Sequence, residues 1–573
     1  MINYFNNNND PNEIPVDSST PRTVIASIPD NSPKGVFRRF LGEAGIVGRV
    51  IAILVIGGAM LTFIGFNGYR YVSTSIAEML VNPYDALNAA DDLAGVLDDS
   101  VVNGASVDSG NTLSGGSTSS VGKPGGGTSS NSTVTVQTPS NQNTTRSIVS
   151  SAGFTHPGVM VSLGQLNTTK KRIGASESPW GSVTVQAKSS AQATKKPTLT
   201  GMVRIDDLSK ACDPFNPGSG CVTNCGYESN PNFGCKDETG DAVAAYTQAL
   251  LWYYTGDEAY AQSSIAILNG WSSVLRGHLG DNRAVQLAWS AESFVRAAEI
   301  MRYTYSPTDG KASFNVDQFN TMLQSAFVPT LSKYGYSGYN GNWELSAIDA
   351  KMSIAVYTDN RALFNSALAQ WRARVPVYIY LKSDGPQPRE PAGGEHSGST
   401  ELGCFWLSNK AEECKTKPKS DPKANYQNGQ IQETCRDFWH VGMGLGSMLN
   451  AAETAAIQGV DLYGEQQERI MTGLSYTAQI ALAYPSAGYP QGFCNGVSGL
   501  KSPSMGLPFE VAYNAYVTRK GVTFKTISIP GLPSRNYSNG DPVRTIIEQN
   551  AGRKETVSLM TAWETLTHRQ VGN

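Results

Sequence analysis

From residue 240 onward, apolar residues recur at the spacing of α-helices. One stripe at steps of four and three consists of Leu287, Ala291, Phe294, Ala298, Met301 and Tyr305. A second stripe consists of Trp343, Ala347, Ala350, Ile354 and Tyr357. Residues at such steps share one face of a helix, so the pattern predicts two long helices and a mostly helical domain.

The same region contains an internal repeat. Five residues of one copy return at identical spacing in the other: Tyr254, Thr255, Ala259, Ser263 and Ala266, then Tyr357, Thr358, Ala362, Ser366 and Ala369. In both copies an apolar helix reaches a short polar turn, at 256–257 or 359–360, and a second helix starts at once. Repeated helix hairpins favour an all-α fold in which paired helices form a ring, an (α/α) toroid. Periodicity alone leaves a bundle open.

An apolar run near the N-terminus predicts a membrane span. Residues 50–66 contain Thr62 as their only clearly polar side chain, and with their flanks they are long enough for a short transmembrane helix. Basic residues precede the run and acidic residues follow it, which predicts a cytoplasmic N-terminus and an outward-facing remainder. A cleaved signal peptide is the alternative, but no convincing small-x-small site follows. We therefore expect a single-pass membrane protein anchored through residues 46–70.

Composition divides the rest of the chain. Residues 1–45 begin with polar, Asn-rich sequence and are expected to form a disordered cytoplasmic tail. Residues 71–101 follow the span as a juxtamembrane segment. Residues 102–151 are dominated by Gly, Ser and Thr and are expected to form a flexible linker. The folded domain is expected over residues 152–573, outside the cytoplasm.

The cysteines gather in the second half of the chain, at Cys212, Cys221, Cys225, Cys235, Cys404, Cys414, Cys435 and Cys494. An even number in one region predicts disulfides and an oxidising compartment. Local pairs such as Cys225 with Cys235 and Cys404 with Cys414 are plausible, although other pairings and free buried thiols remain open. Zinc binding by Cys221 and Cys225 is less expected outside the cell.

Charge and motifs exclude several classes of function. The net charge of -3 provides no basic surface of the kind that nucleic-acid binding requires. The sequence has no HExxH, P-loop or nucleophile-elbow context, so metalloprotease, ATPase and serine-hydrolase functions have no support.

The segment 432–440 contains the densest group of reactive side chains. If it is helical throughout, Glu433, Arg436 and His440 project from one face. Such a pairing suits elimination from a uronate, because Arg can neutralise the C6 carboxylate while His removes the C5 proton. The alternative is a buried Arg–Glu ion pair with His as a cap.

A second candidate lies where the helix near residue 341 should start. Asn342 could donate its amide to a carboxylate, and Trp343 could stack on a sugar ring; the alternative for Asn342 is a simple N-cap. His396, in a polar loop, could line a cleft. His156 and His278 have no supporting neighbours in the sequence.

At these residues the chain resembles the alginate-lyase superfamily, the polysaccharide lyase family 5-like proteins. The resemblance covers about residues 156–568 and rests on segments 156–159, 229–232, 341–344, 371–376, 433–440, 458–463 and 563–568. It implies an incomplete (α/α) toroid with a substrate cleft at its concave end, and no required metal or other cofactor. It also implies an Asn-His pair, an Arg and a Tyr that act on the uronate.

Two of those four positions match. Asn342 corresponds to the Asn and Arg436 to the Arg. Trp343 stands where the histidine would be, and the Tyr has no clear counterpart, with His440 and Met443 in its neighbourhood. Near residue 515, where relatives tend to carry His, this chain has Ala515.

These observations lead to one prediction and two alternatives. We expect a lyase that cleaves an anionic, uronic-acid-containing polysaccharide by β-elimination, with Asn342 and Arg436 on the carboxylate and His440 as base. The proton donor is expected among Tyr339, Tyr513 and Tyr516, and the other substrate contacts among Trp343, Glu433, Tyr516 and His396. The alternatives are an inactive surface protein that binds carbohydrate, or a glycoside hydrolase that uses Glu433 and Glu344.

Overall fold

The computed structural model describes residues 147–199, 220–223, 234–280, 282–333, 341–390, 406, 426–435, 437–487, 508–550 and 560–571. All of them belong to the second of two compact units, Thr133–Asn573. The predicted tail, membrane span and juxtamembrane segment lie outside the described residues, as does the linker up to residue 146. Within the described ranges, no helix has the length and apolar character needed to cross a membrane.

The described chain is mostly helical, as the periodicity predicted. The helices are α5 (Leu163–Gly174), α6 (Trp180–Lys188), α7 (Ala191–Thr194), α8 (Cys235–Thr255), α9 (Glu258–Val274), α10 (Arg283–Thr304), α11 (Val316–Met322), α12 (Val328–Leu331), α13 (Gly341–Tyr357), α14 (Arg361–Tyr378), α17 (Phe438–Ile457), α18 (Leu462–Glu465), α19 (Gln467–Ala487), α20 (Phe509–Tyr513), α21 (Pro542–Asn550) and α22 (Glu564–His568). Two short sheets pair β1 (Ile148–Val149) with β2 (Thr155–His156) and β3 (Cys221–Thr223) with β4 (Gly277–Leu279).

Both predicted hairpins are present. Helix α8 ends at Gly256, whose φ of 71° suits a glycine, and Asp257 caps α9 by accepting from the backbone N–H of Ala259. Helix α13 ends before Asp359, and Asn360 caps α14 by accepting from Leu363. The short polar turns therefore stop one helix and start the next.

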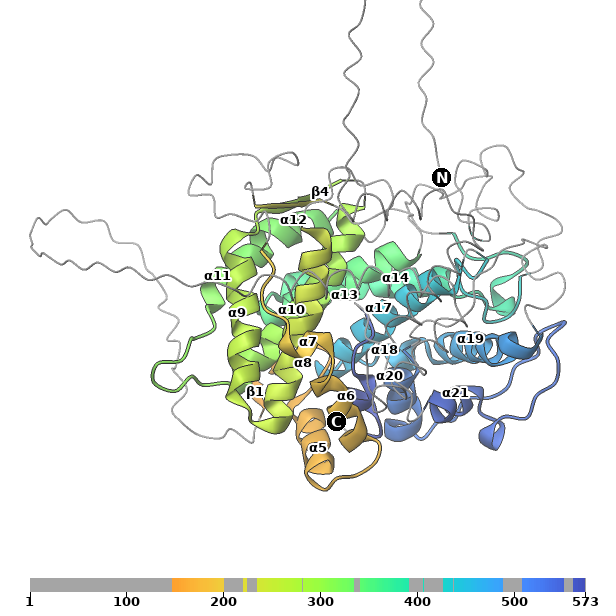
Figure 1. Ribbon diagram of the computed structural model, residues 1–573. Coiled ribbons are helices and arrows are strands. Elements are labelled where there is room, and N and C mark those ends of the chain that lie inside the picture. Colours follow the sequence, from red (N-terminus) through yellow and green to blue (C-terminus); the bar gives the residue numbers. More distant parts are fainter. Residues whose placement is uncertain are drawn as a thin grey trace, which may run out of the picture. The chain divides into compact units, whose positions relative to one another are not determined.

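The four long helices α8, α10, α13 and α17 lie side by side in that order (Figure 1). Helix α9 packs against α8 and α10, and α14 packs mainly against α13. Two contacts fix the direction of α13 and α17: Asn342 meets Met443 and Ser346 meets Ser447, each pair 101 residues apart. Because the sequence separation is the same in both contacts, α13 and α17 run parallel.

Helices α8 and α10 run in that direction too. Along α10, Glu292 binds Ser447 and Arg296, one turn later, binds Asp349. Between α8 and α10, Gln286 donates to Glu238 and Arg296 lies over the ring of Tyr246. The N-terminal ends of all four helices therefore lie at one end of the domain.

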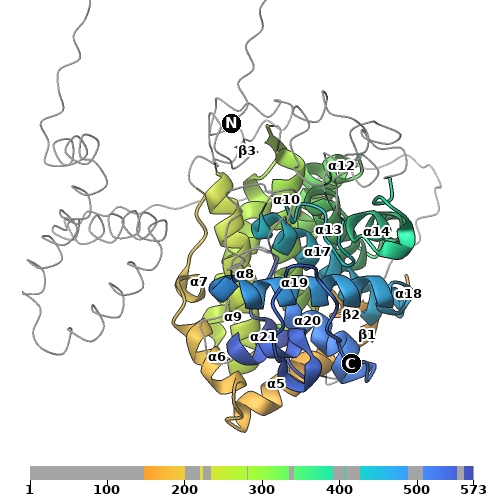
Figure 2. The same cartoon turned by 90° about the vertical axis from the view of Figure 1, so that its right-hand side faces the viewer.

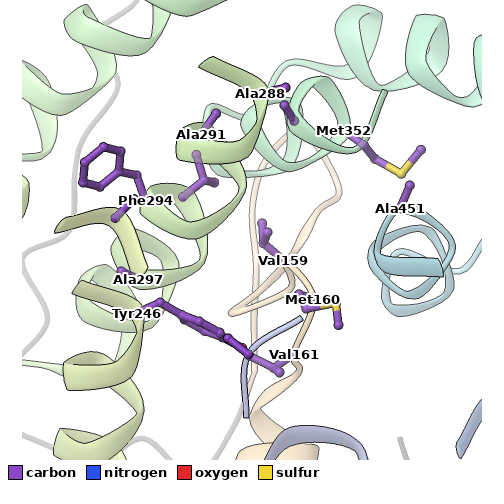
Figure 3. Close-up of a cluster of buried hydrophobic side chains, with 14 of the residues drawn as sticks. Val159, Met160, Val161, Tyr246, Ala288, Ala291, Phe294, Ala297, Met352 and Ala451 are labelled. Atoms are coloured by element: carbon purple, nitrogen blue, oxygen red, sulfur yellow. The ribbon is translucent and has the colours of Figure 1, made fainter. Parts of the chain in front are cut away.

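The other end is filled by the segment before α5. His156 and the backbone N–H of Gly158 bind Glu299 near the end of α10, and Met160 donates to Thr454 near the end of α17. The side chains of Val159, Met160 and Val161 lie among residues of the four helices, including Tyr246, Phe294, Met352 and Ala451 (Figure 3). Residues 159–161 therefore fill the space between α8, α10, α13 and α17 at their C-terminal ends.

Further contacts link the two edges of the row. Helix α17 contacts α20, α20 contacts α22, α22 contacts α5, and α5 contacts α8. Helices α20, α6 and α5 lie near one another in Figure 2. Three cysteines lie in the described part, Cys221, Cys235 and Cys435, and each is disulfide-bonded. The other five cysteines lie outside the described residues, so at least one member of each predicted pair does too.

Candidate functional site

The segment 432–440 is not one helix. Helix α17 begins at Phe438, with Asp437 as its N-cap. Glu433 stands five residues earlier with a φ of 69°, in the left-handed region that an α-helix of L-residues does not use. The prediction that Glu433, Arg436 and His440 share a helical face is therefore wrong. Arg436 itself lies outside the described residues.

Glu433 instead caps a different helix. Its carboxylate is fully buried and accepts two hydrogen bonds from Asn342, at 3.2 Å from the backbone N–H and at 3.4 Å from Nδ2. These bonds satisfy an unpaired N–H in the first turn of α13 and place a negative charge at its positive end. Asn342 is the capped residue and not the cap, so the simple N-cap reading of Asn342 is also wrong.

The side chain of Asn342 lies between Glu433 and α17. Its Nδ2 is 3.9 Å from Sδ of Met443, and its Oδ1 is buried without a hydrogen-bond partner among the described residues. Trp343, the next residue, is half-buried. A buried amide held by a carboxylate presents its remaining atoms in one orientation.

A buried ion pair between α13 and α14 holds the turn of Glu433 in place. The guanidinium of Arg374 lies 3.0 Å from a carboxylate oxygen of Glu344 and donates to Oε1 of Gln432 at 2.6 Å. All three side chains are buried, and together they tie α13 and α14 to the turn that carries Glu433. Glu344 and Glu433 are thus both committed to buried contacts, which speaks against the exposed carboxylate pair that a glycoside hydrolase needs.

Tyr378 fills the space between the starts of α13 and α17. A Cβ on Gly341 would lie 1.9 Å from its ring, and a Cβ on Gly444 would lie 2.1 Å from its hydroxyl oxygen. The hydroxyl donates to the carbonyl of Val441 at 3.3 Å. Burial, with the nearby charge of Glu433, holds the pKa of Tyr378 well above its usual range. Tyr378 therefore spaces the two helices as a neutral phenol.

His440 and Trp439 lie at the accessible start of α17. The His440 side chain is 21% exposed, whereas the rings of His156, His278 and His568 are buried. Trp439 is 44% exposed. His440 precedes Met443 by three residues, a rise of about 4.5 Å on the same side of the helix. It therefore lies about one turn outward from the contact between Met443 and Asn342.

Asp437 contacts His440 twice. One carboxylate oxygen accepts from the His440 backbone N–H at 2.9 Å and from the ring Nδ1 at 2.7 Å. Neither Asp437 nor Trp439 received a role from the sequence. The signal was there for Asp437, since an Asp three residues before a helical position is a common N-cap.

The predicted tyrosines do not join this group. Tyr516 is fully buried and donates to the carbonyl of Tyr463 at 3.0 Å, so it cannot meet substrate as predicted. Tyr513 stacks on Phe524, and burial raises its pKa. Both belong to the packing around α20. Tyr339 and His396 lie outside the described residues.

Two other histidines have partners that the sequence did not reveal. His156 lies 2.6 Å from Glu299 and 3.4 Å from Asp359, and His278 lies 2.7 Å from Glu238. Burial opposes charge on His156, but hydrogen bonds to Asp359 and Glu299 outweigh it and raise the pKa to about 9. These partners are far away along the chain, so local sequence carried no trace of them. The described residues contain no cluster of side chains suited to a metal ion.

Comparison with known proteins shows a similarity over the stretch of chain that contains this candidate site. Residues 226–487 match the family model of alginate lyase, and this stretch contains Asn342, Glu433 and His440. The match supports the prediction that the chain is an enzyme of the polysaccharide lyase class. A crystal structure of an alginate lyase from Bacteroides ovatus is similar over 59% of this chain and 85% of that chain, with 16% identity and a TM-score of 0.38. No curated protein sequence matches the chain.

Proposed function

We propose that the protein cleaves a uronic-acid-containing polysaccharide by β-elimination at the N-terminal ends of α13 and α17. The observation that carries this proposal is the position of His440, a partly exposed imidazole about one turn outward from the buried amide of Asn342. Both residues lie within the stretch that matches alginate lyases.

The electrostatics of this end favour an anionic polymer. Four parallel helices, α8, α10, α13 and α17, direct their N-terminal ends toward it. The partial positive charge of helix N-termini attracts anions. Glu433 already occupies the start of α13, so a substrate carboxylate needs a further cation, and Arg436 is the residue proposed for it. The sugar rings would stack on the exposed Trp439 and on Trp343.

The reaction needs a base and a place for the C6 charge. In the proposed step, a nitrogen lone pair of His440 takes the C5 proton as the C4–C5 double bond forms and the C4–O4 bond breaks. Arg436 is proposed to stabilise the charge that spreads onto the C6 carboxylate. Asn342 is buried and its amide donates to Glu433, so its proposed part is to hold the start of α13 in place beside the substrate. The imidazolium can return the proton to the departing O4, and Tyr339 remains a proposed donor outside the described residues.

The helix order supports an incomplete (α/α) toroid as the fold. The row α8, α10, α13 and α17 forms its inner wall, with α9 and α14 outside, and α20, α22 and α5 connect the edges. The segment 156–161 closes the C-terminal end. Substrate is then expected at the opposite end, where His440 lies.

We also propose that the domain works outside the cytoplasm, anchored through residues 46–70. The support is the apolar run with its flanking charges and the disulfide-bonded state of Cys221, Cys235 and Cys435.

Product analysis tests this proposal. The full-length protein is mixed with alginate, other polyuronates and glycosaminoglycans, and the ultraviolet absorbance of C4–C5 double bonds is followed beside the number of new reducing ends. Absorbance and reducing ends that rise together on at least one polymer establish a lyase and its substrate class. New reducing ends without absorbance would indicate a hydrolase, and saturable binding without either signal would indicate a carbohydrate-binding protein.

A further inference from the structure

Asp437 holds the imidazole of His440 in one orientation at the start of α17. A single oxygen of its carboxylate lies 2.9 Å from the His440 backbone nitrogen and 2.7 Å from the ring Nδ1. The backbone bond is an ordinary N-cap, from the cap residue to the third residue of the helix. The ring bond is an addition that capping does not require.

The ring bond determines which nitrogen carries the proton in the neutral imidazole. A carboxylate can only accept, so Nδ1 must be the protonated nitrogen and Nε2 must carry the lone pair. A free neutral histidine prefers the opposite tautomer, with the proton on Nε2. Asp437 therefore makes His440 a base at Nε2, the ring atom farther from the helix backbone.

The other described histidines do not share this arrangement. His278 directs Nε2 at the carboxylate of Glu238, and His568 directs Nε2 at the carbonyl of Met160, so both carry the proton on Nε2. His156 contacts carboxylates through both nitrogens. Among the histidines that the structure describes, His440 alone combines an acceptor at Nδ1 with a partly exposed ring.

We infer that Asp437 is a positioning residue for the proposed elimination: it fixes the Nδ1–H tautomer of His440, directs Nε2 at the C5 proton and stabilises the imidazolium that forms. The inference rests on the proposed function. During the step, the C5–H bond breaks and an Nε2–H bond forms, while the positive charge on the ring is balanced by the Asp437 carboxylate at Nδ1.

The variant Asp437→Ser separates orientation from capping. Serine is as good an N-cap as aspartate, but its shorter side chain cannot also reach Nδ1 of His440. The matched control is Asp257→Ser, which changes the N-cap of α9 at a position without a histidine contact. Both variants should fold, as circular dichroism and denaturant unfolding can verify.

Two readouts on the full-length protein test the inference. Nitrogen NMR of 15N-histidine-labelled protein, with the His440 signal assigned by its loss in His440→Gln, should show Nδ1–H in the wild type and Nε2–H in Asp437→Ser. In steady-state kinetics, kcat should fall on the order of 10- to 100-fold in Asp437→Ser, the range seen when the side chain that orients a metal-bound imidazole is removed. KM should hardly change, and Asp257→Ser should match the wild type in both readouts.

An Nε2–H tautomer in the wild type, or an unchanged kcat in Asp437→Ser, would overturn the inference. The tautomer is read without substrate, so it is separate from the fate of the proposed function. A wild type that shows Nδ1–H but cleaves no polymer would refute the elimination and leave the orientation of His440 by Asp437 standing.

Discussion

Replacement of His156 by glutamine should remove a pH-dependent part of the stability of the domain. His156 is fully buried and touches the carboxylates of Glu299 and Asp359, which join the segment before α5 to the ends of α10 and α13. Burial disfavours the imidazolium, but the two carboxylates outweigh that cost and raise its pKa from 6.5 to about 9. Glutamine keeps hydrogen-bonding capacity and loses the charge.

The sign and the size follow from linkage. The folded state holds the proton more tightly, so the stabilisation is fully present below pH 6.5 and is lost as pH rises to about 9. The difference between the two values corresponds to about 3 kcal/mol. Lys351 titrates in the opposite sense in part of this window, because burial lowers its pKa to about 7. The pH dependence of wild-type stability therefore mixes both groups. The difference in unfolding free energy between wild type and variant isolates the contribution of His156.

The assay is denaturant unfolding of wild type and His156→Gln at several pH values from 6 to about 9.5. The difference in unfolding free energy should shrink by about 3 kcal/mol across that range. His568→Gln is the control: burial lowers the pKa of His568 to about 4, so its removal should change the difference by less than about 1 kcal/mol above pH 6, and in the opposite sense to the removal of His156. A constant difference between wild type and His156→Gln would refute the assignment of His156 as a buried imidazolium.

Three further predictions concern packing, the site and topology. Gly444→Ala should lower the unfolding free energy by about 1–3 kcal/mol because its Cβ meets Tyr378, whereas Gly181→Ala, with open space in helix α6, should be neutral or stabilising; equal effects would contradict the packing. Glu433→Gln should lower both stability, by about 1–3 kcal/mol, and kcat/KM, because Asn342 loses a charged partner; unchanged kinetics would separate Glu433 from the site. Protease added outside intact cells should release the domain through residues 102–145, and full resistance would count against outward display.

The helices were predictable because their signals are local. The apolar stripes of α10 and α13 and the turns at Gly256 and Asn360 reside in neighbouring residues. The parallel order of α8, α10, α13 and α17 was not predictable, because it depends on contacts between residues 48 to 155 positions apart, such as Glu238 with Gln286 and Ser346 with Ser447. The hairpin repeat indicated a ring of helices without giving its order.

The site shows the same division. Asn342 and His440 were selected from their motifs and stay predictions as site residues, and in the structure their helices meet where Asn342 contacts Met443. The prediction that Glu433 shares a helical face with His440 was wrong, because nothing in the neighbouring sequence indicates the left-handed backbone of Glu433. The burial of Tyr516 could not be predicted, because it results from packing against Tyr463, which is distant in the sequence. Asp437 was missed because its ring contact depends on where α17 starts.

The proposed elimination depends most on His440 as the base. The measurement that tests this directly is the initial rate of ultraviolet absorbance increase for full-length wild type and His440→Ala on the polyuronate that the wild type cleaves fastest. Loss of a general base should lower kcat by about 10²- to 10⁴-fold while the fold, checked by circular dichroism, is retained. A His440→Ala variant that produces unsaturated ends at the wild-type rate would show that His440 is not the base.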